Sequence, residues 1–311
     1  MPTQSTPAAP LYFRDRHGID VAYRRWPVAE PRGIVILSHG ASEHSGRYER
    51  FASAVNDAGF SAWALDHRGH GGTAPSTGPG VMGAPGGQAL AHDLDDLVGL
   101  AKTAQPLAPV AVFGHSMGSL IALAYATMYP HRLDALILCG LPAEPVSIGA
   151  IAHAMAALPQ EARDQPGPSL TDYNTPFEPA RTPFDWLSRD PDEVDRYLAD
   201  PLCGEQLPLT NGFMADLLEF VGPAFTHQAL AAISCPVHLI AGAKDPASGM
   251  GANTDALYDV LEAARVDVTS HHYPGARHEL LNETNRDEVT ADLLAWLQQH
   301  LVGAPDESRV S

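Results

Sequence analysis

The stretch VAVFGHSMGSLIALAYATM, residues 110–128, decides the fold. Its first four residues, Val110–Phe113, form a continuous apolar run, which is typical of a strand buried on both faces. The segment Gly114-His115-Ser116-Met117-Gly118 follows, and a helix is predicted over Met117–Met128. A strand that turns through G-x-S-x-G directly into a helix presents the serine hydroxyl above the sheet on a strained backbone. We therefore predict that Ser116 is a nucleophile.

The pattern around this stretch predicts a mostly parallel sheet with helices on both faces, an α/β fold. A β-hairpin is expected around His17-Gly18, between Tyr12–Phe13 and Val21–Trp26. Four further apolar runs are expected to be buried strands: Ile34–Leu37, Ser61–Leu65, Ala135–Leu138 and Val237–Ala241. The helices expected between and after them are Tyr48–Ala58, Ala89–Ala104, Thr254–Ala264 and Asp287–Leu301.

The alternation of strands and helices stops between about Leu141 and Ala232. This part of the chain is rich in proline, alanine and aromatic residues, and short helices such as Pro191–Leu198 and Phe213–Phe220 are plausible in it. A segment of this length is more than a loop. We therefore predict a helical cap over residues 143–230, inserted into a core made of residues 1–142 and 231–311.

Composition limits the classes of function. The 311 residues include 37 acidic and 19 basic side chains, which gives a net charge of −18. Such a field repels phosphate backbones and anionic membrane surfaces, so nucleic-acid binding is not expected. No apolar run approaches the length of a membrane helix, which is about 18 residues. We therefore expect neither nucleic acid nor an integral membrane anchor among the partners of this chain.

The cysteines and the N-terminus bear on location. Cys139, Cys203 and Cys235 lie far apart and show no zinc-type spacing, which favours free structural thiols in a reducing compartment. The polar segment Met1–Pro10 lacks the basic and apolar regions of a signal peptide. These features predict a cytoplasmic protein.

Two partners for Ser116 are predicted from the chain order of serine, acid and histidine. The strand Val237–Ala241 leads to Asp245, and a strand-like run at Val266–Tyr273 leads to His278. Carboxyl ends of parallel strands share one edge of the sheet, so all three side chains should meet there. Asp245 would fix the tautomer of His278, and His278 would take the proton of Ser116.

An oxyanion hole is expected from two backbone amides. The strand Ile34–Leu37 runs into a loop that begins Ser38-His39-Gly40-Ala41, where this type of site places one amide donor. The amide of Ala41 is the predicted donor from that loop. The amide of Met117, at the start of the helix, is its predicted partner.

Other residues compete for these roles. Glu144 follows the strand Ala135–Leu138 and is an alternative acid, and His271 and His272 precede His278. Five further histidines could suggest a metal site, but their spacings match no common ligand pattern: His39, His44, His67, His70 and His92. We expect no metal and no organic cofactor.

Three motifs together resemble the monoacylglycerol lipase and lysophospholipase-like α/β-hydrolases, a serine aminopeptidase S33-type group. They are residues 39–48 (HGASEHSGRY), residues 66–71 (DHRGHG) and residues 114–119 (GHSMGS). The resemblance covers about Val21 to Leu301 outside the cap, although many relatives have glycine where this chain has Ser119. It implies the α/β-hydrolase fold and cleavage of an acyl ester, with the oxyanion held by Ala41 and Met117.

The predicted function is hydrolysis of small apolar esters, such as a monoacylglycerol or a lysophospholipid, through an acyl-enzyme. Candidate substrate-lining residues in the cap are Phe177, Trp186, Phe213 and Phe220. A proline iminopeptidase would use the same triad and would need acidic cap residues, for which the candidates are Glu161, Asp185, Asp192 and Glu205. A perhydrolase, a C–C hydrolase and a non-catalytic binding protein also remain open, and the oligomeric state is not readable.

Overall fold

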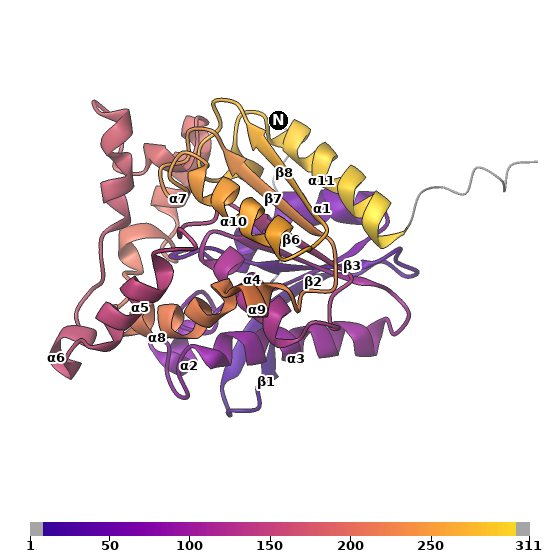
Figure 1. Ribbon diagram of the computed structural model, residues 1–311, viewed down its shortest axis with the longest axis horizontal. Coiled ribbons are helices and arrows are strands. Elements are labelled where there is room, and N and C mark those ends of the chain that lie inside the picture. The colour runs from indigo at the N-terminus through magenta and orange to yellow at the C-terminus, as the bar shows by residue number, and fades with distance from the viewer. Residues whose placement is uncertain (1–8, 303–311) are drawn as a thin grey trace, which may run out of the picture.

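The computed structural model describes residues 9–302 and has one eight-stranded sheet in the order β1-β2-β4-β3-β5-β6-β7-β8 (Figure 1). The strands are β1 (Leu11–Arg14), β2 (Asp20–Trp26), β3 (Ile34–Ser38), β4 (Ser61–Leu65), β5 (Val110–His115), β6 (Ala135–Cys139), β7 (Val237–Gly242) and β8 (Val268–Tyr273). The hairpin of β1 and β2 joins β4 in antiparallel fashion, and the remaining pairs are parallel. The predicted α/β class is therefore confirmed.

Successive residues of an inner strand point to opposite faces of the sheet. Both faces therefore present apolar side chains, and helices cover both. Ile34 and Ile36 belong to the apolar cluster that includes α3 (Gln88–Ala104) and α4 (Met117–Met128). Val35 and Leu37 belong to the opposite cluster, under α1 (Glu49–Asp57) and α11 (Arg286–Leu301). Two other helices belong to the core, the short α2 (Ala74–Thr77) and α10 (Ala252–Ala263).

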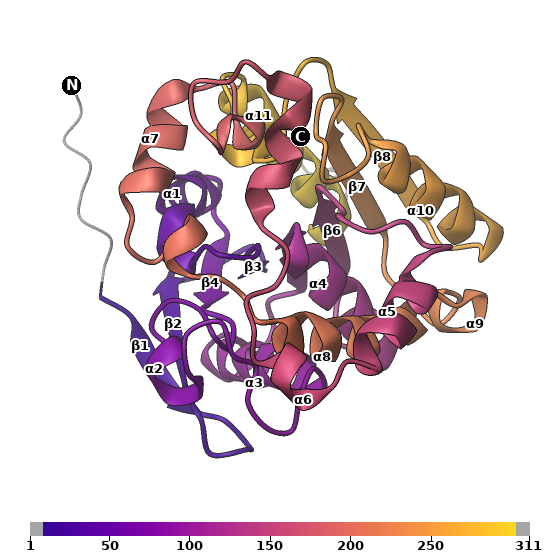
Figure 2. The same ribbon diagram turned by 90° about the vertical axis from the view of Figure 1, so that its left-hand side faces the viewer.

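The chain between β6 and β7 is mainly helical and lies at one end of the sheet (Figure 1, left; Figure 2). Its helices are α5 (Ile148–Ala156), α6 (Gln160–Arg163), α7 (Pro191–Ala199), α8 (Asn211–Val221) and α9 (His227–Leu230), joined by short 3₁₀ turns. One isolated bridge pairs Pro166 with Thr210. Division of the chain at residues 143 and 230 stays a prediction, and we call residues 143–230 the cap below.

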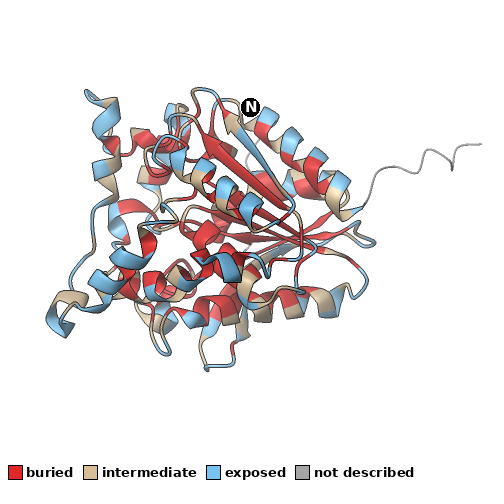
Figure 3. Ribbon diagram, in the orientation of Figure 1, coloured by how far each residue is buried: buried red, intermediate tan, exposed pale blue. Residues whose placement is uncertain are grey.

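The helix α5 is the main element that the sequence analysis did not anticipate. Its residues, IGAIAHAMA, carry no acidic or lysine/arginine side chain and show no clear polar face. Ile148 and Ala152 are buried, whereas Ile151 is 48% exposed. Figure 3 shows the exposed residues of the chain in pale blue. Within residues 9–302, no helix is long and apolar enough to cross a membrane. The prediction for the N-terminal segment falls mostly on residues 1–8, outside the described residues.

Candidate active site

Ser116 stands at the sharp turn between β5 and α4. Its backbone has φ 53° and ψ −121°, a conformation that is strained for a residue with a Cβ. The turn is held because the Ser116 amide donates to the carbonyl of Cys139 at 2.8 Å. A Cβ on Gly118 would lie 2.0 Å from the carbonyl oxygen of Ser38, so only glycine allows α4 to approach β3 this closely. This is the strand–turn–helix geometry that exposes a serine hydroxyl.

Asp245 and His278 come together at the ends of β7 and β8. His278 Nδ1 lies 2.9 Å from Asp245 Oδ2, and both residues are buried. Burial alone would raise the pKa of Asp245, but the facing His278 and the Ala247 amide outweigh it and hold this pKa below its usual range. The carboxylate therefore accepts the Nδ1 proton, which leaves Nε2 of His278 as the basic nitrogen.

The predicted oxyanion loop touches the nucleophile. A Cβ placed on Gly40 would lie 3.2 Å from the Cβ of Ser116, so the two backbones are in close contact. The next residue, Ala41, and Met117 at the start of α4 both line the same cavity as Ser116. Their role as oxyanion donors stays a prediction.

A cavity of about 810 Å³ opens over these residues, between the core and the cap. Ser116 and His278 lie on its wall, together with an apolar group from α4, α5 and α8: Leu120, Ile148, Ile151, Met214, Leu217 and Leu218. Its acidic side chains are Glu43, Glu144, Asp172, Glu205 and Glu279. A cavity of this size accommodates a drug-sized ligand.

The four aromatic candidates of the cap lie in different places. Trp186 lines the cavity, and its ring centroid is 4.9 Å from that of His278. Phe213 packs on His70, Phe220 lines a separate groove beside Gly87, and Phe177 lies under the guanidinium of Arg277. Contact of any of these residues with substrate stays a prediction.

The rival residues are engaged elsewhere. Glu144 is exposed on the cavity wall, whereas Asp245 is the carboxylate on His278. His271 packs edge-on against Tyr273, and His272 pairs with Asp255. The choice of Asp245 and His278 over these residues stays a prediction.

Two buried histidines behind the predicted oxyanion loop, His39 and His70, accept hydrogen bonds from backbone amides. His39 Nε2 accepts from the amide of His67, and His70 Nε2 accepts from the amide of Ser42. Burial lowers the pKa of His70 to about 3, so it is a neutral acceptor. His67 bonds Ser38, whereas His92 lies far from the loop and stacks on His17.

One cluster among the described residues brings potential metal ligands together, namely His44, Asp200 and Cys203, whose ligand atoms lie within 4.8 Å of one another. His44 Nδ1 accepts from the amide of Gly46, so Nε2 carries the proton and donates it to Asp200 at 2.9 Å. A metal at Nε2 would have to displace that proton and break the Gly46 bond. The cluster is thus better described as a hydrogen-bonded contact between core and cap.

The sequence analysis missed the residues that support the site from behind and the aliphatic cavity wall. Glu43, Arg47 and His115 lie within the motifs that carry the family resemblance, so a signal was present. The wall residues Met214 and Leu217 gave no such signal, because residue type alone does not tell which side of a helix faces a cavity.

This fold, with a serine at the strained turn and a buried Asp–His pair on one cavity, defines a hydrolase of the α/β-hydrolase class. A family model described as "Serine aminopeptidase, S33" matches residues 29–285. The chain belongs to this family.

Known relatives cover almost the whole chain. A monoacylglycerol lipase of Mycolicibacterium smegmatis is 33% identical over 289 residues, 91% of this chain and 95% of that protein. The monoglyceride lipase of Homo sapiens is 29% identical over 286 residues, 90% and 88% of the two chains. Among solved structures, a thermostable carboxyl esterase from Bacillus coagulans has a TM-score of 0.84 and 31% identity, over 94% of this chain and 98% of that one.

Proposed function

We propose that this chain is a serine hydrolase of carboxylic esters, with Ser116 as nucleophile, His278 as general base and Asp245 as the acid. The single observation that carries the proposal is the buried Asp245–His278 hydrogen bond of 2.9 Å, on the same cavity as the strained Ser116. The names of the relatives support an ester as substrate, since they are monoacylglycerol lipases and a carboxyl esterase.

The reaction follows from these positions. Ser116 Oγ attacks the ester carbonyl carbon while Nε2 of His278 accepts the hydroxyl proton. The oxygen of the tetrahedral intermediate is stabilised by the amides of Ala41 and Met117. The alcohol leaves with the proton from His278, and the acyl group stays on Ser116. A water then attacks the acyl-enzyme while His278 takes its proton. The acid is released as the acyl–Oγ bond breaks and His278 returns that proton to Ser116 Oγ.

The cavity wall favours neutral substrates with an apolar acyl group. The aliphatic side chains of α4, α5 and α8 suit an acyl chain, whereas the exposed Glu144, Asp172 and Glu205 on the wall would repel a phosphate or a carboxylate. A monoacylglycerol meets both conditions. We therefore place it ahead of a lysophospholipid as substrate.

The test is the initial rate of hydrolysis of monoacylglycerol and of p-nitrophenyl acetate, butyrate, octanoate and palmitate. We expect turnover that is fastest on short to medium chains. Ser116→Ala should remove it almost completely, because its loss removes the covalent step. Ser119→Ala is the matched control, since the Ser119 hydroxyl only donates to the Ser116 carbonyl at 2.6 Å. No ester turnover, or equal turnover by Ser116→Ala, would contradict the proposal.

A peptidase acting on N-terminal proline is the second candidate, because the family description names an aminopeptidase and Glu205 lines the cavity. The other acidic candidates are placed less favourably: Glu161 is exposed on α6, Asp192 lies at the start of α7, and Asp185 accepts from Arg181 and Thr182. Cleavage of proline naphthylamide, abolished by Glu205→Gln, would favour the peptidase. The cytoplasmic location and the absence of a cofactor remain part of the proposal.

A further inference from the structure

A buried cluster of polar side chains lies directly behind the catalytic residues. We call Glu43, Arg47, Tyr48, His115 and Glu279 the Glu43 cluster. Glu43 is 3% exposed and His115 is 7% exposed, so water satisfies little of their hydrogen bonding. The cluster joins the loop that follows β3, the last residue of β5 and the loop that follows β8.

The Glu43 carboxylate is surrounded by donors. Oε1 accepts from the Gly40 amide at 2.6 Å and from the Tyr48 hydroxyl at 2.9 Å, and it lies 3.1 Å from His115 Nδ1. Oε2 accepts from Arg47 at 2.9 Å. Burial opposes the ionised form, but the bond with His115 and the charge of Arg47 hold the pKa of Glu43 well below its usual range. A carboxylate in this state only accepts, so Nδ1 of His115 carries a proton.

The other ring nitrogen of His115 also faces an acceptor. Nε2 lies 3.3 Å from the backbone carbonyl oxygen of His278, a long hydrogen bond. A carbonyl cannot donate, so Nε2 carries a proton as well. Two protonated ring nitrogens make an imidazolium.

The charges of the cluster support the same state. Glu279 forms a two-pronged ion pair with Arg47, with one contact at 2.8 Å, and Glu43 is the second carboxylate. Two buried anions then face one guanidinium, and an uncompensated buried charge is costly. A protonated His115 supplies the missing positive charge.

Two other titratable groups face His115. The His278 ring centroid lies 4.7 Å from that of His115, and Asp245 is the carboxylate bonded to His278. Cys139, which lines a small pocket with Glu43 and His115, is a thiol whose pKa burial raises, so it adds no charge.

We propose that His115 is a positioning residue, held as an imidazolium, whose two N–H groups tie the oxyanion loop to the loop of His278. Glu43 accepts from the Gly40 amide, so the bond from His115 to Glu43 is linked to the backbone of the oxyanion loop. His115 directly precedes Ser116, so its ring holds the backbone at Ser116 in place relative to the oxyanion loop and the loop of His278. The role in catalysis rests on the proposed function, whereas the charge state of His115 does not.

The direct test is NMR of the whole protein labelled with ¹⁵N-histidine, with the His115 signals identified by their loss in His115→Gln. Burial opposes the charged ring, but the bond to Glu43 and its charge outweigh burial and raise the pKa of His115 above the ordinary value of about 6.5. At about pH 6.5, both ring nitrogens should therefore carry a proton in most native molecules, and Glu43→Gln should lower that fraction. A native protein in which one ring nitrogen is mostly unprotonated at about pH 6.5 would overturn the proposal.

The role in positioning is tested by kinetics on p-nitrophenyl butyrate. His115→Gln can donate only from one amide group, so we expect kcat to fall about 10- to 100-fold with KM changed less than about threefold. His271→Gln, on an exposed histidine of β8, is the matched control and should match the native rates. An unchanged kcat in folded His115→Gln would contradict the positioning role. If a fluorophosphonate labels Ser116 of the native protein, the proposed nucleophile is reactive. An unchanged kcat in His115→Gln would then count against the positioning role and not against the proposed function.

Discussion

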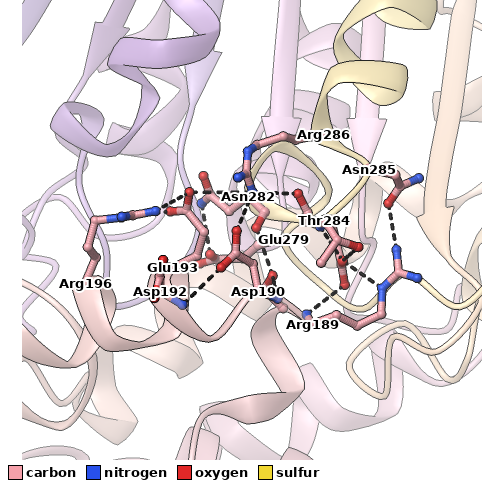
Figure 4. A network of polar contacts seen from close by, with 12 residues as sticks. Arg189, Asp190, Asp192, Glu193, Arg196, Glu279, Asn282, Thr284, Asn285 and Arg286 are labelled. Atoms are coloured by element: carbon pink, nitrogen blue, oxygen red, sulfur yellow. Dashed lines mark hydrogen bonds and ion pairs between the residues drawn. The ribbon is translucent and has the colours of Figure 1, made fainter. Parts of the chain in front are cut away.

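Two parts of the cap, residues 143–183 and residues 184–210, differ in how they are attached to the core. Residues 184–210, the inner cap, are bonded to the core by side chains and backbone alike. Arg189 pairs with Glu283 at 2.8 Å, Arg286 with Asp190 at 2.7 Å and Arg50 with Glu193 at 2.6 Å. Figure 4 shows most of this network, with Arg189 reaching toward Asn285. The inner cap also contacts His278 directly, since the Trp186 carbonyl oxygen lies 3.4 Å from the His278 amide nitrogen.

We call residues 143–183 the outer cap. Among the described residues, each side-chain hydrogen bond and ion pair of the outer cap is made with a residue of the cap. Arg163 pairs with Asp216, and Arg181 pairs with Asp195 at 2.6 Å. Phe177 reaches the core by lying under Arg277. The difference indicates that the inner cap is a fixed wall of the active site, whereas the outer cap is the part that can yield to a substrate.

The largest effect is expected from loss of an inner ion pair. Arg189→Ala leaves Glu283, which is fully buried, without its guanidinium and should lower the free energy of unfolding by about 2–4 kcal/mol. Arg181→Ala, eight positions earlier, breaks a pair whose side chains are 46% and 57% exposed, so solvent screens this pair and the loss of stability should be much smaller. Urea unfolding of both variants measures the difference. Equal losses would remove the distinction between the two parts.

The next effect concerns the part of the cavity beside Met214, where we propose that the acyl chain lies. Met214→Trp on α8 would fill space between the cap and α4 and should reduce kcat/KM for octanoate about tenfold relative to acetate. Glu219→Trp, on the same helix but beside the separate groove, is its control and should leave the ratio unchanged. If both variants shift the ratio alike, the acyl chain does not lie along Met214.

Acid should loosen the inner cap. Burial opposes ionisation of Asp190 and Glu193, but their arginine partners hold the pKa of each carboxyl below its usual range. Groups with a lowered folded-state pKa stabilise above their unfolded values, about 3.9 and 4.3, and lose that contribution as the pH falls further. The double variant Asp190→Asn, Glu193→Gln should thus be about 1–2 kcal/mol less stable at pH 7, and the difference should shrink as the pH falls below about 4. Parallel curves from thermal unfolding against pH would contradict this account.

The smallest effect is expected in the outer cap. Ile151 is 48% exposed and lines the cavity from α5. Ile151→Ser should change the free energy of unfolding by no more than about 0.5 kcal/mol, since little apolar area is lost. Its KM for octanoate should rise while that for acetate stays constant. A loss of stability comparable with that of Arg189→Ala would show that the outer cap is as firmly attached as the inner one.

The core was predictable because its signals are local. Apolar runs of four to five residues specified β3, β4, β5, β6 and β7, and Met117–Met128 is the observed α4. The G-x-S-x-G segment and the ends of β7 and the following strand were enough to single out Ser116, Asp245 and His278. The structure brings Asp245 and His278 into contact and sets Ser116 on the same cavity.

The cavity wall was less predictable because it depends on which way each cap helix faces. On α8, Met214, Leu217 and Leu218 share one side at helical spacing and line the cavity. Phe213 and Phe220, seven residues apart, lie on the adjoining side of α8 and pack toward His70 and Gly87. Choosing cap residues by aromatic type could not separate these two sides, which only packing against α4 and α5 defines.

The central claim, that Ser116 is activated by His278, is tested most directly by intact mass measurement after exposure to a fluorophosphonate. The account predicts one adduct on the native protein, located on Ser116 by peptide mapping, no adduct on Ser116→Ala and much slower labelling of His278→Gln. Native protein that stays unlabelled, or a Ser116→Ala variant that is labelled equally, would contradict it.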